Sequence, residues 1–220
     1  MKSLALLSLI TAVLANPINY SLEARQSQPQ GIDVSGFQPN VNWAQAKANG
    51  LTFAFIKATE GTTFISGTFS NQYTGATNAG FIRGAYHFAH PDSSNGADQA
   101  NFFLAHGGGW TADGKCIPAR REDNALHFLE SSWIKDFSNT YQSKTGRFPI
   151  IYTTTDWWTT CTGNSAAFGN DNPLWIAHYA SSIGILPAGW SFTTFWQYAD
   201  SGPNPGDQDL FNGDATGLQR

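Results

Sequence analysis

The sequence predicts an α/β fold, a TIM-like (β/α) barrel with an incomplete helical ring in a single domain. Short apolar runs rich in β-branched and aromatic residues alternate with segments of helical composition, and this alternation is typical of parallel strands joined by helices. The roughly 190 residues after residue 30 are enough for one well-buried core and few for two domains. Because the last third carries many turn residues and little helical pattern, we expect helices to be missing from the ring there.

Seven strands and four helices are predicted. The strands are expected at Gly31–Val34, Thr52–Ala58, Gly84–Phe88, Phe148–Tyr152, Leu174–His178, Thr194–Tyr198 and, most weakly, Asp209–Phe211. The helices are expected at Trp43–Asn49, Phe69–Ala79, Asp98–His106 and Ser132–Lys144, with Asn42 as the N-cap of the first. An open doubly wound sheet is the alternative arrangement. No Gly-x-Gly-x-x-Gly follows a predicted strand, so no dinucleotide site is expected.

The first 15 residues have the pattern of a secretory signal peptide. Lys2 precedes an uncharged block from Leu4 to Ala15, which is too short to cross a bilayer and ends in small residues. Residues 16–30 hold few apolar side chains and are interpreted as a pro-segment or linker. We therefore expect residues 31–220 to form the folded domain of a secreted, extracellular and monomeric protein that has no membrane contact after removal of the signal.

Charge and cysteine content exclude several classes of protein. The net charge is −4 and no basic cluster exceeds Arg120-Arg121, so the chain lacks the basic surface that nucleic-acid binding requires. No C-x-x-C, H-E-x-x-H or calcium loop occurs, so neither a metal nor another cofactor is predicted. The two cysteines, Cys116 and Cys161, suit one disulfide in an oxidising compartment, although their spacing does not decide whether the geometry permits it.

Acidic, amide and aromatic side chains recur at one end of the predicted strands, where a parallel barrel builds its functional face. These strand-end residues are Asp33, Glu60, Tyr86, His87, Tyr152, Trp175, Tyr179, Trp196, Gln197, Asp207 and Asp209. Hydrolysis of a glycosidic bond needs one carboxyl group that donates a proton and another that stabilises or attacks the developing cation. The pattern therefore favours a glycosidase. Taken singly, three of the residues have a structural explanation: Asp33 as a turn cap, Glu60 as a solvated loop acid and His87 as a core histidine.

Seven sequence blocks follow one another between Gly31 and about Gly217. They are Gly31-Ile32-Asp33-Val34-Ser35, Phe55-Ile56-Lys57-Ala58-Thr59-Glu60-Gly61, Gly84-Ala85-Tyr86-His87-Phe88, Ile151-Tyr152, Leu174-Trp175-Ile176-Ala177-His178-Tyr179, Trp196-Gln197-Tyr198 and Asp207-Gln208-Asp209-Leu210-Phe211. In this order the chain resembles the glycoside hydrolase family 25 lysozymes, in particular their secreted fungal branch. Seven ordered blocks make the resemblance more specific than any single motif.

The resemblance implies a flattened barrel with fewer helices than a full TIM ring. It also implies hydrolysis of the β-1,4 bond between N-acetylmuramic acid and N-acetylglucosamine in bacterial peptidoglycan, by a retaining or substrate-assisted mechanism. Its acidic pocket residues correspond to Asp33, Glu60, Asp207 and Asp209. Its sugar-contacting wall corresponds to Tyr86, Tyr152, Trp175 and Trp196, and the same blocks add His87, Tyr179 and Gln197 as expected substrate-binding residues.

One segment departs from the family pattern. The family's fourth strand ends in Asp-x-Glu, whose glutamate is the proton donor, whereas residues 119–130 contain no such motif. Three explanations compete: the coding sequence is wrongly joined here, the protein is a non-catalytic homologue, or Glu122 replaces the donor. The first is favoured because Arg-Arg-Glu-Asp-Asn is unlike a buried strand while both flanks match. The same loss would remove the family's usual partner of Cys161, leaving Cys116 as a substitute or both cysteines unpaired.

The predicted function is therefore a secreted lysozyme acting on bacterial peptidoglycan, with reduced or absent activity if the proton donor is lost. The alternative is a non-catalytic homologue that binds peptidoglycan or chitin through the aromatic groove. A chitinase-like hydrolase is disfavoured because its Asp-x-x-Asp-x-Asp-x-Glu signature is absent.

Overall fold

The computed structural model describes residues 28–109, 118–120 and 129–219. The predicted signal peptide, Cys116 and Glu122 lie outside these residues, as does most of the predicted pro-segment. In the described ranges, no helix combines the length and the apolar character that a membrane span requires.

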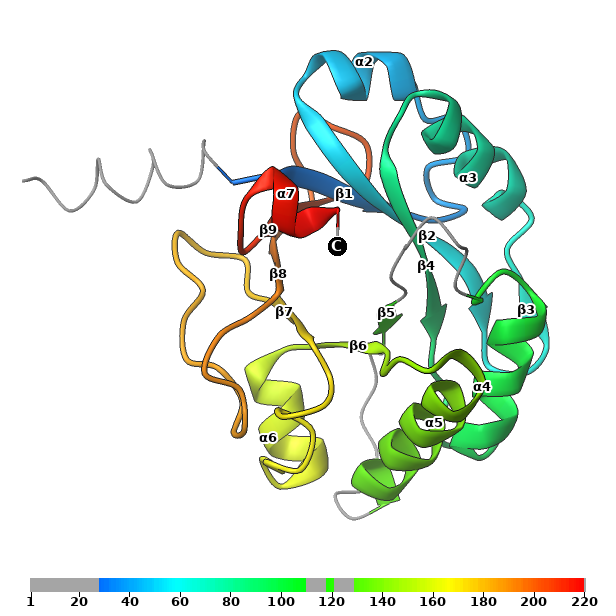
Figure 1. The fold of residues 1–220 in the computed structure, drawn as a ribbon, viewed down its shortest axis with the longest axis vertical. Coiled ribbons are helices and arrows are strands. Elements are labelled where there is room, and N and C mark those ends of the chain that lie inside the picture. The colour runs from blue at the N-terminus through cyan, green and yellow to red at the C-terminus, as the bar shows by residue number, and fades with distance from the viewer. Residues whose placement is uncertain (1–27, 110–117, 121–128, 220) are drawn as a thin grey trace, which may run out of the picture.

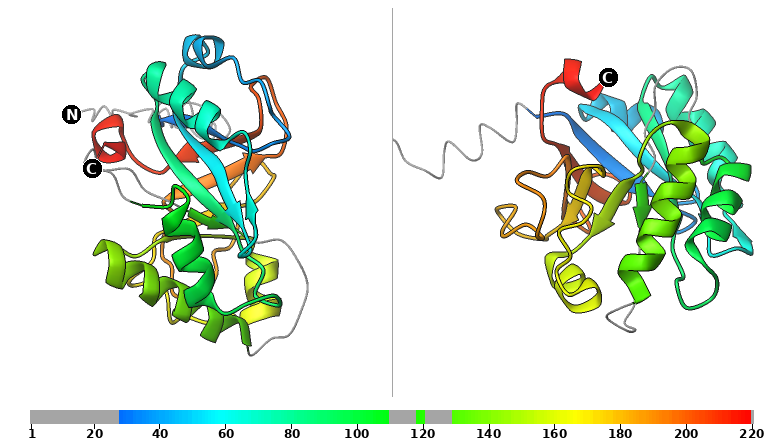
Figure 2. Two further views of the ribbon diagram at one scale, coloured as in Figure 1. Left: turned by 90° about the vertical axis from the view of Figure 1, so that its right-hand side faces the viewer. Right: turned by 60° about the horizontal axis from the view of Figure 1, so that its bottom comes forward.

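The described residues form a mixed α/β fold around one curled sheet (Figure 1). The strands are β1 (Gln30–Val34), β2 (Leu51–Glu60), β3 (Phe64–Ile65), β4 (Ile82–Phe88), β5 (Pro118–Arg120), β6 (Ile150–Thr153), β7 (Leu174–Ala177), β8 (Phe195–Ala199) and β9 (Asp207–Phe211). The helices are α2 (Trp43–Ala48), α3 (Phe69–Asn78), α4 (Gly96–Ala105), α5 (Leu129–Thr145), α6 (Thr155–Thr162) and α7 (Ala215–Leu218). Helices α3, α4 and α5 lie on the outer side of the curled sheet (Figure 2).

The strand order is β1-β9-β8-β7-β6-β5-β4-β2-β3, and β1 also pairs with β2. The neighbours from β1 through β2, β4, β5, β6 and β7 to β8 are parallel, whereas β9 is antiparallel to both β8 and β1. The predicted TIM-like barrel is not confirmed, because β9 breaks the parallel pattern and no helix of the described residues follows β7 or β8. The chain after β7 is rich in turn residues, which explains why irregular connections replace helices there.

The inner face of the sheet is packed with aromatic rings. Rings from strands that are not neighbours touch each other: the centroids of Phe55 on β2 and Trp175 on β7 lie 4.8 Å apart, and those of Phe53 and Phe195 lie 5.2 Å apart. Leu218 of α7 packs against the same cluster, near the residues at which β2, β6 and β8 begin. These rings therefore fill the interior between the two ends of the sheet. Among the described residues, a hollow of about 220 Å³ remains beside α7 at this end, and larger hollows lie at the other end.

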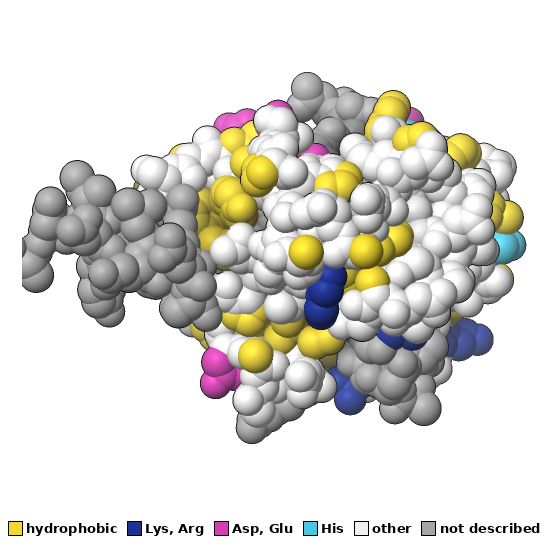
Figure 3. All heavy atoms as spheres, turned by 90° about the horizontal axis from the view of Figure 1, so that it is seen from above, with side chains coloured by type: hydrophobic (Ala, Val, Ile, Leu, Met, Phe, Trp, Pro, Cys, Tyr) yellow, Lys and Arg dark blue, Asp and Glu magenta, His cyan; other side chains and the backbone are white. Residues whose placement is uncertain are grey.

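The outer face is covered in two different ways. Helices α2 to α5 cover the outward residues of β1, β2 and β4. Val34 belongs to one buried cluster with Trp43 of α2, and Ala85 to another with Phe103 of α4. Over β6, β7 and β8 the cover comes from α6 and irregular connections, where the Trp158 and Trp190 rings meet at 5.0 Å. The surface on the α2 side carries only scattered charged side chains among its described residues (Figure 3).

Four elements were not predicted from the sequence: β5, α6 and the short elements β3 and α7. Helix α6 was not predicted, because threonine and tryptophan are weak helix formers. It forms because Thr154 Oγ1 caps its first turn by accepting from the Trp157 N–H at 3.0 Å, and because Trp158 is buried. Strand β5 forms between β4 and β6 although residues 118–120 lack an apolar run. The predicted N-cap of α2 is confirmed, since Asn42 accepts from the Gln45 N–H at 3.0 Å.

The close packing of the inner face makes Gly31 sensitive to substitution. A Cβ at this position would lie 2.4 Å from Cε2 of Phe53. We predict that Gly31→Ala lowers the free energy of unfolding by about 1–3 kcal/mol, because an overpacked core forces side chains and backbone to shift. Urea unfolding followed by tryptophan fluorescence measures this change. Gly67→Ala is the matched control, since a Cβ there meets no atom within 4 Å; an equal loss in both variants would contradict the packing explanation.

Candidate active site

The side-chain amide of Gln197 on β8 joins two carboxylates at the open end of the sheet. Its Nε2 donates to Oδ2 of Asp33 at 2.6 Å and to Oδ2 of Asp207 at 2.9 Å. Because β9 is antiparallel to β1, its first residue, Asp207, is the register partner of Asp33 near the end of β1. The reversed strand therefore brings together two acids that are far apart in the sequence.

Two phenols complete the hydrogen bonding of Gln197. The hydroxyls of Tyr152 and Tyr179 donate to its Oε1 at 2.7 and 2.9 Å. Both hydrogens of the amide nitrogen and both lone pairs of the amide oxygen are then used, which fixes the orientation of the amide. Gln197 itself is buried, and a buried amide with all its hydrogen bonds satisfied is held rigidly. Five residues predicted from the sequence thus form one cluster.

Asp209 and Trp175 lie below this cluster and support it. Oδ1 of the buried Asp209 accepts from Nε1 of Trp175 at 2.8 Å, and the Trp175 ring packs edge-on against Tyr152 at 4.8 Å. Both residues are enclosed, so we assign them the task of holding Tyr152 in place. Gly206 lets the chain approach β1, since it has a φ of +75° and a Cβ would lie 2.1 Å from the carbonyl oxygen of Asp33.

A hollow of about 430 Å³ opens above the two carboxylates. This volume falls within the range of small-molecule sites. Asp33, Asp207, Tyr86 and Lys57 contribute to its wall, and the ring of Phe37 stands at its edge with 93% of its surface exposed. Neither Lys57 nor Phe37 was predicted. Lys57 lies in the same sequence block as Glu60, which was the predicted residue of that block, and no motif includes Phe37.

A second hollow of about 740 Å³ meets the first at Tyr179, which lines both. Tyr152, His178 and Ile185 also line it, and Ile185 is largely exposed. The open surface therefore continues from the carboxylates across the ends of β6 and β7. Aromatic and apolar side chains beside polar groups are the surface that a sugar chain requires.

Glu60 is engaged with two basic side chains rather than directed into the hollow. Its Oε2 pairs with the ammonium group of Lys57, and its Oε1 lies 2.8 Å from Nε2 of His90. Burial raises the pKa of the Glu60 carboxyl, but the hydrogen bonds and charges of Lys57 and His90 outweigh burial, so the pKa lies below its usual value. This arrangement disfavours Glu60 as a proton donor, and its catalytic role stays a prediction.

His87 is placed away from the hollow, which corrects its prediction as a substrate-binding residue. Oε1 of Gln99 accepts from the backbone N–H of His90 at 3.0 Å, so Nε2 of His87, 2.9 Å from this oxygen, must donate to it. Nδ1 of His87 then accepts from Oγ1 of Thr59 at 2.8 Å. Burial lowers the pKa of His87 to about 4, although the hydrogen bond with Gln99 acts in the opposite direction.

Trp196 also lies on the other face of the sheet. It alternates with the inward residues Phe195 and Gln197, and its Nε1 donates to the carbonyl oxygen of His178 at 2.9 Å. Its ring belongs to the outer cluster that contains Trp158 and Trp190. The prediction that Trp196 contacts sugar is therefore wrong in this structure.

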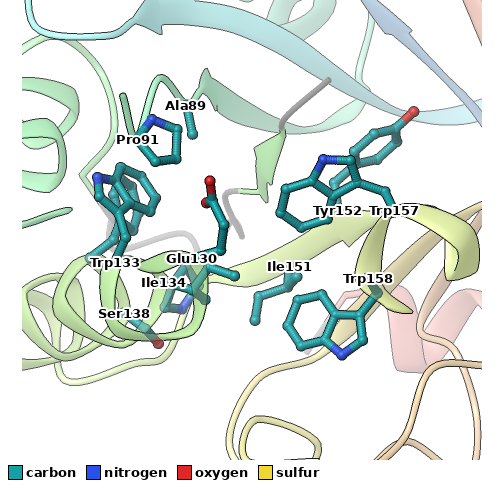
Figure 4. A pocket seen from close by; sticks show the side chains of 12 residues that line it. Ala89, Pro91, Glu130, Trp133, Ile134, Ser138, Ile151, Tyr152, Trp157 and Trp158 are labelled. Atoms are coloured by element: carbon teal, nitrogen blue, oxygen red, sulfur yellow. The ribbon is translucent and has the colours of Figure 1, made fainter. Parts of the chain in front are cut away.

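A separate small cavity of about 40 Å³ lies between α5, α6 and β6. The buried carboxyl group of Glu130 points into it, opposite Tyr152 and Trp157 (Figure 4). Because one water molecule needs about 10–15 Å³, this cavity has room for a few waters and not for a sugar ring. Glu130 was not predicted, since an acid in the first turn of a helix such as α5 has an ordinary structural explanation.

Some predicted residues stay outside this description. Glu122 and Cys116 lie outside the described residues, so a donor role for Glu122 and a bond between Cys116 and Cys161 stay predictions. Cys161 itself is buried on α6. Within the described ranges, no three His, Cys, Asp or Glu side chains are grouped in a way that could hold a metal ion.

Comparisons with known proteins agree on one family. Residues 32–207 match the model of glycosyl hydrolases family 25. An N,O-diacetylmuramidase of Arthroderma benhamiae is 50% identical over 209 residues, covering 90% of this chain and 88% of the relative. A muramidase structure from Acremonium alcalophilum is 53% identical with a TM-score of 0.83, and a family GH25 lysozyme structure from Aspergillus fumigatus is 45% identical with a TM-score of 0.85. Each of these two alignments covers 87% of this chain and 97% of the other chain.

The buried His87 predicts a pH dependence of stability. The unfolded chain takes up this proton near pH 6.5 and the folded chain only near pH 4, so the unfolded state binds more protons between these values. The free energy of unfolding should therefore fall by up to about 3 kcal/mol from His87 alone as the pH drops from 6.5 to 4. Urea unfolding at a series of pH values measures the slope.

The controls for this prediction are two glutamine variants. His87→Gln should be less stable at neutral pH but should show a flatter slope, because the titrating group is gone. His178→Gln removes an exposed histidine and should keep the wild-type slope. Identical slopes for wild type and His87→Gln would refute the assignment.

Proposed function

The chain belongs to glycosyl hydrolases family 25, a family of glycosidases, and from this premise we propose that its site acts on the β-1,4 bond between N-acetylmuramic acid and N-acetylglucosamine in bacterial peptidoglycan. Relatives named muramidase or lysozyme support this substrate. One observation carries the proposal: Gln197 holds Asp33 and Asp207 side by side on the floor of a hollow.

The two carboxylates suit the developing charge of glycosidic cleavage. Breaking the bond creates an oxocarbenium-like centre, which nearby carboxylates stabilise and can attack. Asp33 and Asp207 are pre-oriented by the Gln197 amide, so little reorganisation is needed when the charge develops. The exposed Tyr179 and Phe37 supply surface for the sugar rings, and the largely buried Tyr86 contributes to the wall of the hollow.

A second candidate function is binding of peptidoglycan or chitin without cleavage. The observation that favours it is the missing Asp-x-Glu motif in residues 119–130, together with the engagement of Glu60 by Lys57 and His90. Without a carboxylic acid beside the leaving oxygen, the site would still bind the glycan but would not protonate it. We also propose that the chain acts outside the cell, on the strength of the signal-peptide pattern in residues 1–15.

Release of reducing ends from purified peptidoglycan separates these two functions. We compare the chain as written with a version in which an Asp-x-Glu strand is restored between Pro118 and Ser131. We expect release from the restored version and little or none from the chain as written, because only the former has the proton donor. Cleavage at the same rate by both would place the donor among the residues already present, such as Glu122. No cleavage by either, with binding retained, would favour the binding protein.

The carboxylate pair can be tested in the cleaving version. Asp33→Asn should lower the cleavage rate at least about a hundredfold, because it removes a pre-oriented negative charge while nearly preserving shape. Asp171→Asn is the control, since Asp171 is exposed in the connection before β7. Thermal unfolding checks that both variants fold. If the Asp33→Asn variant folds and cleaves at an unchanged rate, Asp33 takes no part in the mechanism.

A further inference from the structure

We infer that Lys57 selects the substrate by binding the carboxylate that muramic acid carries on its O3 substituent. This inference rests on the proposed function and adds the residue that distinguishes peptidoglycan from chitin. N-acetylmuramic acid differs from N-acetylglucosamine by a lactyl ether at O3. That group ends in a carboxylate in peptide-free glycan, and in a peptide with carboxylates of its own where a stem is attached.

The charges around the hollow make a cation necessary for an acidic substrate. Among the described residues that line it, Asp33, Asp200 and Asp207 are acidic and Lys57 is the one basic side chain. A wall that carried only acids would repel the carboxylate of a muramoyl residue, because like charges that face each other at a binding site lower the affinity. Lys57 therefore supplies the attraction that a muramoyl residue needs and that a neutral chitin chain does not use.

The fold holds the Lys57 ammonium group in place from several sides. Nζ pairs with Oε2 of Glu60 and lies 4.8 Å from the ring centroid of Phe88 and 5.3 Å from that of Phe64. The side chain is only 15% exposed, so little water screens its charge. An ammonium group has three N–H donors, and one hydrogen bond to Glu60 leaves capacity for a ligand.

The anchor of Lys57 is itself anchored by helix α4. Nε2 of His90 lies 2.8 Å from Glu60, and Gln99 of α4 fixes the His90 backbone by accepting from its N–H at 3.0 Å and donating to its carbonyl oxygen at 2.6 Å. A partly exposed ion pair contributes little to stability by itself. The contacts from Gln99 through His90 and Glu60 fix the Lys57 ammonium group at the wall of the hollow, where a ligand would meet it.

Equilibrium binding of the full chain to defined tetrasaccharides tests the inference. The ligands are a peptide-free tetrasaccharide with free lactyl carboxylates, the same glycan with these groups coupled to neutral L-alaninamide, the glycan with anionic L-alanyl-D-isoglutamate stems, and chitotetraose. We expect wild type to bind an anionic muramoyl glycan about tenfold more tightly than chitotetraose, as one charge pair typically allows. Preference for the free lactyl glycan or for the dipeptide glycan identifies which carboxylate is bound.

Three variants make the result specific to Lys57. Lys57→Gln should lose the preference for the anionic glycans over chitotetraose. Lys57→Arg should keep most of that preference, because the charge stays. Lys47→Gln is the control, since Lys47 lies on α2 and donates to the carbonyl oxygen of Gly80; it should bind all ligands as wild type does.

The outcomes separate this inference from the proposed function. If wild type binds muramoyl glycans and chitotetraose equally, or if Lys57→Gln keeps the preference, Lys57 is not the selective residue although the site still binds glycan. If wild type binds none of the four ligands, the proposed function fails and the inference fails with it. Circular dichroism and thermal unfolding establish that each variant is folded.

Discussion

One amide group connects the parts of the site. The Gln197 side chain reaches across the inner face of the sheet to Asp33 on β1 and Asp207 on β9, and receives hydrogen bonds from Tyr152 and Tyr179. The amide can satisfy all four partners only if β1, β6, β8 and β9 keep their register. The packed aromatic rings below these strands hold that register, because they leave no room for a strand to slip.

A second hydrogen-bond chain approaches the hollow from the opposite side. It begins at Gln99 on α4, passes through the His90 backbone and ring to Glu60, and ends at Lys57. Gln99 also accepts from the neutral, buried His87, so the same amide ties the outer face of β4 to its carboxyl end. The two chains divide the charges of the site: the first presents carboxylates to the hollow and the second presents an ammonium group.

Strand β5 shows that the backbone pairing of a strand does not depend on the side chains that its chemistry requires. Pro118–Arg120 pairs with β4 and β6 through backbone groups, which every sequence possesses. A strand of three residues can therefore fill the gap in the sheet without the apolar run expected of a central strand. The catalytic acid expected at the end of this strand depends on side chains, and the Asp-x-Glu motif is missing from the sequence. The sheet can thus persist where the chemistry of that strand is altered.

Local pattern was sufficient to predict most of the strands, the N-cap of α2 and the acids of the site, because hydrophobic periodicity, capping chemistry and strand-end motifs are encoded by neighbouring residues. Asp33, Tyr152, Tyr179, Gln197 and Asp207 were all recognisable in this way. Local pattern could not show that β9 is antiparallel, which is what places Asp207 beside Asp33.

The facing of individual side chains was decided by tertiary structure. His87, Trp196 and Asp209 carry the same chemistry as the residues around the hollow, but strand alternation turns His87 and Trp196 to the outer face and packing encloses Asp209. Helix α6 depends on the burial of Trp158 by residues from distant connections. Lys57 gained significance only from the acids that the fold assembles around it. The sequence alone determined which chemical groups stand at the strand ends. The tertiary structure decided which of these groups meet, because a contact between distant strands depends on strand direction and register, which no local pattern encodes.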